Sequence, residues 1–178
     1  MPGVPALFED QLAIVEELLA EVRRMEEGER RFAAGASPTG YEREIRLAGL
    51  AQRVAQAYTI VEGVLAFVAR RIDRAPPAGD DWHKKLILRC SQPFEKPARP
   101  AVISAALAAD LLELCQFRRV VRSIYPTRLD ESRVKENLER LIRSARAFAG
   151  ECKAFAASRP SVRRGRRAGR SGTKRARK

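Results

Sequence analysis

The apolar residues between positions 41 and 72 recur at alternating intervals of three and four. An α-helix turns once every 3.6 residues, so side chains at this spacing lie on one face. A half-buried strand would alternate every two residues, and no stretch of the chain does so over a strand's length. The pattern therefore predicts a long amphipathic helix, Tyr41–Ile72, whose apolar face consists of Leu47, Leu50, Val54, Ala57, Val61, Val64 and Val68.

Two further stretches have the same periodicity. One predicts a helix from Pro5 to about Phe32, and the other predicts the last helix of the chain, which Asp130 can cap. An amphipathic helix needs a partner that covers its apolar face, so these helices are expected to pack on one another. Their apolar faces consist of Phe8, Leu12, Val15, Leu19 and Val22, and of Val134, Leu138, Leu141, Ala145, Phe148, Cys152 and Phe155.

Capping residues and prolines delimit two more helices. Ser104 can cap a helix that runs to Tyr125, and Pro126 ends it because the residue before a proline disfavours helical geometry. A short helix is expected over Asp80–Leu88, capped by Asp80 or by Asp81. Aromatic residues make up only 6% of the chain, so the core must be mostly Leu, Val and Ala. We predict an all-α bundle of four long helices and one short helix.

The net charge of +13 is concentrated at the carboxyl end. From Ser158 onward there are ten Lys or Arg and no acidic residue, which leaves 25 basic and 22 acidic residues in the rest of the chain. The sequence therefore predicts a folded domain over residues 1–157 and a disordered Arg/Lys-rich tail over residues 158–178. Such a tail attracts polyanions of any kind and says little about the folded domain.

Several kinds of site are missing from the sequence. No Gly-rich phosphate loop is present, and the chain has one histidine, His83, so we expect no bound cofactor and no metal site. Cys90, Cys115 and Cys152 are far apart and are expected to be small buried hydrophobic residues. No uncharged apolar run approaches the ~20 residues of a membrane span. We expect a cytoplasmic protein that does not bind membranes.

One stretch has the residue types of a phosphate-binding site. Within Phe117–Tyr125, Arg118, Arg122 and Tyr125 are spaced i, i+4 and i+7, so a helix places them on one face. Guanidinium groups bind phosphate through paired N–H donors, and a phenol can stack on a base. The competing interpretation is a solvated basic helix end, where positive charge suits the helix dipole.

Six short patterns occur in an order that is similar to a known family. They are Ala57–Glu62, Ala69–Asp73, Trp82–Leu86, Arg99–Ser104, Phe117–Tyr125 and Leu129–Asp130. Together they resemble the HepT-like ribonuclease domain of the HEPN superfamily, over residues from about 10 to 150.

The resemblance implies a fold, an activity and partners. It implies a HEPN-type helical bundle that forms a homodimer, and a toxin of a two-gene toxin–antitoxin module whose partner is a nucleotidyltransferase antitoxin of the MNT type. The implied activity is metal-independent cleavage of RNA. Arg118 matches the motif Arg, Arg122 matches an Arg common in this branch, and Tyr125 matches the Tyr to which the antitoxin transfers AMP. These three residues are therefore the candidate catalytic residues. Arg119 and His83 are further candidates for RNA binding.

The chain departs from the family motif at three positions. Ser123 stands where the motif has His, Arg119 stands where branch members often have His, and Pro126 replaces the usual Gly. Serine is a poor general base unless another group activates it, whereas an imidazole exchanges protons near neutral pH. His83 matches a branch position and is the remaining imidazole, but nothing in the sequence places it near Arg118.

Three functions therefore stay open at the level of sequence. The first is a HepT-like endoribonuclease. The second is a catalytically inactive HEPN module that binds RNA or a nucleotidyltransferase through the same residues. The third is a helical scaffold whose contacts with nucleic acid come only from residues 158–178.

Overall fold

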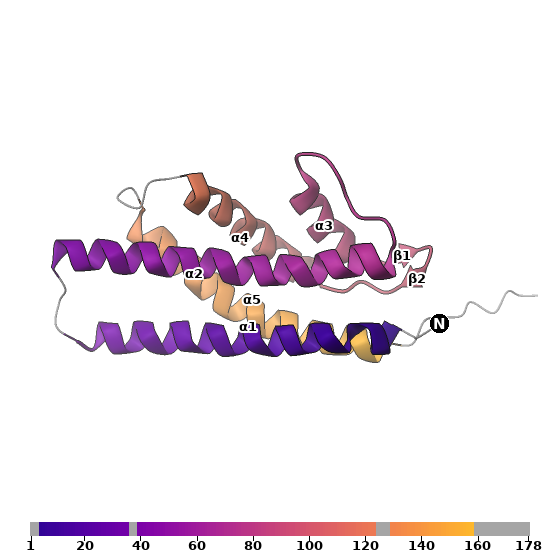
Figure 1. Ribbon diagram of the computed structural model, residues 1–178, viewed down its shortest axis with the longest axis horizontal. Helices are drawn as coiled ribbons and strands as arrows, with labels where there is room; N and C mark the ends of the chain where they lie inside the picture. Colours follow the sequence, from indigo (N-terminus) through magenta and orange to yellow (C-terminus); the bar gives the residue numbers. More distant parts are fainter. Residues whose placement is uncertain (1–3, 36–38, 124–128, 159–178) are drawn as a thin grey trace, which may run out of the picture.

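The computed structural model describes residues 4–35, 39–123 and 129–158, and it shows an all-α bundle (Figure 1). The long helices α1 (Val4–Ala33) and α2 (Gly40–Phe67) run antiparallel to each other. The predicted architecture of four long helices and one short helix is confirmed for this part of the chain.

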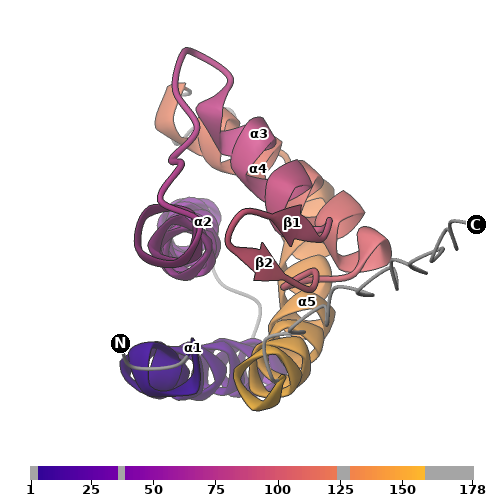
Figure 2. The same cartoon turned by 90° about the vertical axis from the view of Figure 1, so that its right-hand side faces the viewer.

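Helix α2 lies at the centre of the bundle and packs against α1, α3 (Trp82–Cys90), α4 (Ala105–Ser123) and α5 (Glu131–Ala157). Seen end on, α1 and α5 lie on one side of α2, and α3 and α4 lie on the other (Figure 2). The residues predicted for the apolar face of α2 are all buried, as the three-four spacing requires. Helix α2 is therefore covered on the side of α1 and α5 and on the side of α3 and α4.

Local signals explain most of the helix ends. Thr39 caps α2 through a capping box, in which its hydroxyl accepts from the Glu42 N–H and the Glu42 carboxylate accepts from the Thr39 N–H. Ser104 caps α4 by accepting from the Leu107 N–H at 3.2 Å, as predicted. The cap predicted for the short helix is wrong, because α3 begins after Asp81 and the Asp81 side chain makes no capping hydrogen bond.

Two features of the backbone differ from the prediction. The last turn of the predicted helix Tyr41–Ile72 is a wider π-helix, η1 (Val68–Ile72). The connector after α3 contains a small antiparallel hairpin of β1 (Phe94–Glu95) and β2 (Ala98–Arg99) that was not predicted. Helix α4 is described as far as Ser123, so its predicted end at Tyr125 stays a prediction. Tyr125 itself and the predicted tail beyond Ser158 lie outside the part of the chain that the structure describes.

A buried ion pair connects the hairpin to the end of η1. Arg99 donates from Nε and Nη2 to the two carboxylate oxygens of Asp73, at 2.5 and 2.6 Å, and its third nitrogen, Nη1, donates to the Gln92 and Pro100 carbonyls. Both side chains are almost fully covered. Because a buried charge must be compensated, the pair determines where the connector lies relative to α2 and η1.

The three cysteines are buried and unpaired, as predicted. Burial raises the pKa of the Cys90 thiol to about 12 and that of Cys152 to about 12. Among the described helices, none is long and apolar enough to cross a membrane.

Candidate functional site

The candidate site is built around Glu62, a buried carboxylate on α2. Glu62 is only 7% exposed, and it is the one charged residue between Arg53 and Arg70. A carboxylate is rarely buried to this extent unless a cation or several donors compensate it. Two side chains, one from α3 and one from α4, approach it.

The first of these side chains is His83 on α3. Its ring nitrogen Nδ1 lies 2.8 Å from Glu62 Oε1, which is a hydrogen-bonding distance. The imidazole stacks on the neighbouring Trp82, with ring centroids 3.8 Å apart and planes inclined by 29°. The His83 side chain is 23% exposed, so the ring is held on two sides and still reaches solvent. A carboxylate on Nδ1 fixes the orientation of an imidazole and leaves Nε2 for other partners.

The second side chain is Arg118 on α4. Its Nε donates to the Thr59 hydroxyl at 3.0 Å, and its Nη1 lies 3.9 Å from Glu62 Oε2. The Thr59 hydroxyl in turn donates to the Ala55 carbonyl at 3.0 Å, so its lone pairs are directed toward the guanidinium. The Arg118 side chain is 14% exposed. Two neighbouring residues of α2 therefore fix Arg118 close to the imidazole of His83.

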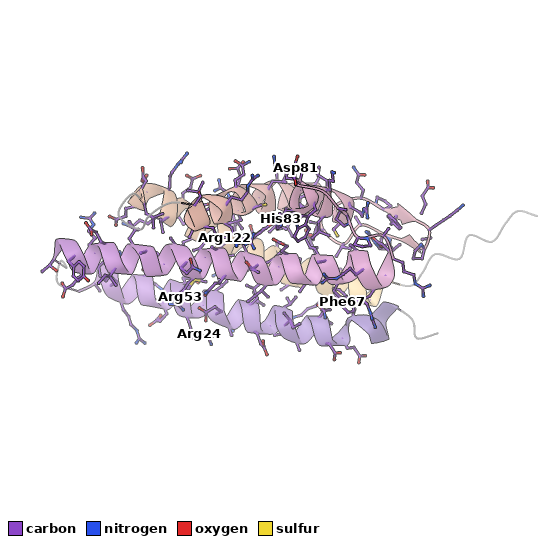
Figure 3. All side chains as sticks on the ribbon, turned by 45° about the horizontal axis from the view of Figure 1, so that its top comes forward. Arg24, Arg53, Phe67, Asp81, His83 and Arg122 are labelled. Atoms are coloured by element: carbon purple, nitrogen blue, oxygen red, sulfur yellow. The ribbon has the colours of Figure 1, made fainter. Side chains whose placement is uncertain are left out.

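The other predicted residues of α4 lie toward solvent. Arg119 and Arg122 are exposed, and Arg122 follows Arg118 by one helical turn. In Figure 3, His83 and Arg122 both lie along α2, on the side where α3 and α4 pack. Ser123, at the position of the motif His, is exposed, and its hydroxyl donates to the Val120 carbonyl at 3.1 Å. Nothing among the described residues activates that hydroxyl.

A buried phenol lies one helical turn before Glu62. Tyr58 is 1% exposed, and no described residue forms a hydrogen bond with its hydroxyl. Burial is the main cause that raises the pKa of Tyr58, and the adjacent Cys115 thiol raises it further. The phenol is therefore protonated at any physiological pH and contributes a neutral hydroxyl beneath Glu62 and Arg118.

Sequence reasoning named His83, Arg118 and Arg122 but did not identify Glu62 or Thr59 as site residues. A signal for Glu62 was present, because a single charge within sixteen otherwise uncharged positions of a buried helix has to meet a partner. No such signal existed for Thr59, since a helical Thr commonly bonds its own backbone.

The described residues contain no group of three His, Cys, Asp or Glu side chains placed to hold a metal ion. A separate cavity of about 340 Å³ lies between α4 and α5, and Arg118 does not line it. Its lining includes three carboxylates and two guanidinium groups, those of Glu113, Asp130, Glu136, Arg133 and Arg140, so its charges largely offset one another and do not favour a polyanion.

Comparison with known proteins gives one match. A family model described as HepT-like protein matches residues 49–159, which is more than half of the chain. The matched region contains Glu62, His83 and Arg118. No curated protein and no solved structure matches this chain.

Proposed function

We propose that this chain, which belongs to the HepT-like family of HEPN-related proteins, is a toxin that cleaves RNA without a metal ion. The single observation that supports cleavage is the bridge made by Glu62, whose two oxygens meet His83 and Arg118. The family motif has its imidazole at the position of Ser123. Here the one histidine of the chain lies beside the motif Arg instead, and we assign it the role of the missing imidazole.

The proposed reaction uses the RNA's own 2′-hydroxyl as the nucleophile. His83 Nε2 takes the proton of that hydroxyl while the 2′-oxygen bonds to the phosphorus, and the bond from phosphorus to the 5′-oxygen breaks. The leaving 5′-oxygen takes a proton from the solvent or from an imidazolium, so the products are a 2′,3′-cyclic phosphate and a 5′-hydroxyl. Glu62 acts as a positioning residue, since it orients the imidazole and stabilises it once it is protonated.

The two arginines have the electrostatic role. Negative charge develops on the phosphate oxygens as the 2′-oxygen attacks, and fixed guanidinium donors stabilise that charge. Arg118 uses its Nε on Thr59, and its Nη1 lies 3.9 Å from Glu62, beyond hydrogen-bonding distance, which leaves the N–H donors of its two terminal nitrogens for a phosphate. Arg122 is exposed and can reach the same phosphate from one turn further along α4.

The family relationship also supports a proposal about two binding partners, a second copy of the chain and an antitoxin. We propose that the chain forms a homodimer and that a nucleotidyltransferase antitoxin inactivates it by transferring AMP to Tyr125. In this transfer the phenol oxygen bonds to the α-phosphorus of ATP and the bond from that phosphorus to the bridging oxygen breaks. Pyrophosphate leaves from ATP, and the phenol gives up its proton. Incubation with such an antitoxin and ATP should add one AMP to the wild-type chain and none to Tyr125→Phe, as read by mass spectrometry.

The test of cleavage uses purified protein, a short RNA and EDTA in excess. The expected result is a product with a 2′,3′-cyclic phosphate, and no cleavage of the matching strand with a 2′-deoxyribose before the scissile phosphate. Arg122→Ala should lower the rate, and Arg23→Ala, an exposed arginine on α1, is the matched control. Arg122 is exposed, so its loss should not affect folding. Intact RNA after long incubation with folded wild-type protein would contradict the proposal.

A second function, binding without cleavage, is favoured by the state of Ser123. Its hydroxyl is tied to its own helix and has no activating partner among the described residues. A catalytically inactive HEPN module would then bind RNA, or the antitoxin, through Arg118, Arg119 and Arg122. It predicts RNA affinity that falls steeply with salt while the RNA stays intact.

A further inference from the structure

A small cavity lies next to His83, at the junction of η1, the following loop and α3. It has a volume of about 260 Å³, and its lining includes Trp82, Arg70, Pro76, Pro77 and Ala78. We call it the Trp82 pocket. The contacts of Glu62 with His83 and Arg118 do not involve this pocket, and the family match assigns it no role.

The chain builds this pocket from rigid parts. Pro76 and Pro77 restrict the backbone of the loop, because the proline ring fixes φ. Its floor is formed by buried residues of α2, η1 and α3, namely Ala66, Ala69 and Leu86. The alanines are small, which leaves space between the helices beside the indole. The pocket therefore exists without any rearrangement of the fold.

Size and chemistry limit what the pocket can hold. Its volume is slightly below the lower end, ~300 Å³, of small-molecule sites, so it suits one flat ring system better than a whole nucleotide. Its lining is apolar and aromatic, with one guanidinium, Arg70, and no carboxylate. That differs from the α4–α5 cavity, whose lining includes three carboxylates beside two guanidinium groups. A nucleobase has the required shape, stacks on aromatic rings and joins a negatively charged backbone that Arg70 can contact.

The pocket adjoins the candidate site through Trp82. Trp82, which lines the pocket, is stacked on His83, which contacts Glu62. Glu62, Ala66 and Arg70 follow one another at intervals of one turn along α2 and η1, about 5.4 Å per turn. A strand whose phosphate lies at Arg118 would place a neighbouring nucleotide over this side of the bundle.

We propose that the Trp82 pocket binds the base of a nucleotide adjacent to the cleaved bond in single-stranded RNA. This inference rests on the proposed function insofar as it names the RNA as substrate. The pocket accepts an unpaired base, so the substrate is single-stranded RNA and a duplex is excluded. Because every base has a flat aromatic face, stacking on Trp82 gives affinity with little sequence preference.

The experiment uses the fact that Trp82 is the only tryptophan of the chain. Its fluorescence is followed during titration with a non-cleavable 2′-O-methyl tetranucleotide and with the same strand carrying abasic positions. We expect saturable quenching by the intact strand, and at least about 5-fold weaker binding of the abasic strand, which corresponds to the lower end of stacking of ~1–3 kcal/mol per base. Equal quenching by both strands, or no saturable change, would overturn the inference.

Two variants and a control test the pocket itself. Ala78→Phe fills the pocket from an exposed position, and Arg70→Ala removes its guanidinium, so both should weaken binding of the intact strand. Ala13→Phe, at an exposed alanine of α1, should bind as the wild type does. If Ala78→Phe and Arg70→Ala both fold and bind normally, the inference is wrong.

The outcomes separate this inference from the proposed function. Base-dependent quenching together with intact RNA in the cleavage assay supports the pocket and contradicts cleavage. Cleavage without base-dependent quenching supports the proposed function and rejects the pocket. A double-stranded RNA that binds and quenches as well as the single strand also rejects it.

Discussion

Glu62 is the residue on which the site depends. Its carboxylate is buried between an imidazole and a guanidinium that are far apart in the sequence, at positions 83 and 118. A buried carboxylate with both partners present is compensated, and without one of them it is costly. The contacts of Glu62 therefore contribute both to the packing of α3 and α4 on α2 and to the cleavage that we propose.

Glu62→Gln keeps the shape of the side chain and removes its charge. The amide cannot stabilise a protonated His83, and it weakens the attraction that holds Arg118. We expect single-turnover cleavage of RNA to slow by ~100-fold, the lower end of what general acid–base catalysis contributes. Glu17→Gln, at an exposed position of α1, is the control and should cleave at the wild-type rate. An unchanged rate in a folded Glu62→Gln protein would remove Glu62 from the mechanism.

The buried pair of Asp73 and Arg99 makes a prediction about stability alone. Asp73→Ala leaves the Arg99 guanidinium buried without its carboxylate, and we expect a loss of about 3–5 kcal/mol in the free energy of unfolding. Asp110 pairs with Arg143, which is half exposed, so Arg143→Ala should cost at most about 1 kcal/mol. Urea denaturation measures both, and similar losses in the two variants would contradict the distinction.

Among the secondary-structure elements, the long helices could be predicted from the sequence, but the β1–β2 hairpin and the π-helix η1 could not. The three-four spacing located α1, α2 and α5 because apolar residues at that spacing must share a face. The hairpin of β1 and β2 was missed because strands of two residues are too short to show alternation. The π-turn of η1 was missed because its residues continue the helical pattern.

The site was only partly predictable for a related reason. Arg118 and Arg122 are close in sequence, so helix geometry alone places them on one face. The approach of His83 to Arg118 depends on how α3 packs on α2 and α4, and no local pattern encodes that packing. The position of Tyr125 relative to these residues stays a prediction, as it lies outside the described residues.

The start of α5 makes a pH-dependent prediction. Asp130 accepts from the Ser132 hydroxyl and from the N–H groups of Ser132 and Arg133. These bonds, the one from the Ser132 hydroxyl most of all, hold the pKa of Asp130 below its ordinary value of 3.8. The stabilisation is therefore complete above about pH 4 and is lost as the pH falls through the lowered pKa.

The variant that tests this cap is Asp130→Asn, with thermal unfolding followed by circular dichroism. Asparagine also caps helices and does not titrate, so we expect a small loss in Tm at pH 7 for Asp130→Asn and a larger loss for Asp130→Ala. The difference in Tm between wild type and Asp130→Ala should shrink at strongly acidic pH, whereas the difference between the two variants should not. If the difference in Tm between wild type and Asp130→Ala stays constant down to the lowest pH, the ionised Asp130 carboxylate does not stabilise the start of α5.

For the whole molecule, the important property is where the positive charge lies. The chain carries +13, and ten of its basic residues follow Ser158. Many arginines of the bundle form ion pairs between helices, such as Arg53 with Glu21 and Arg146 with Glu26. We therefore propose that attraction of RNA over distance and recognition at the site belong to different parts of the chain.

Deletion of residues 159–178 tests the contribution of the basic tail separately from that of the candidate site. We expect weaker RNA binding with a shallower dependence on salt, because each lost phosphate contact lowers the slope of log affinity against log salt by ~0.7 for a single strand. Cleavage at saturating RNA should persist, since Glu62, His83 and Arg118 remain. Loss of all RNA binding and cleavage on deletion would instead favour a scaffold that contacts RNA only through its tail.

The most direct test of the central claim is the single-turnover rate of RNA cleavage by His83→Ala in EDTA, with and without free imidazole. If His83 supplies the imidazole that the motif lacks, the rate should fall by ~100-fold or more and recover in part when imidazole is added, which a purely structural role would not produce. Cleavage by His83→Ala at the wild-type rate, or a loss that imidazole does not restore in a protein that remains folded, would contradict the account.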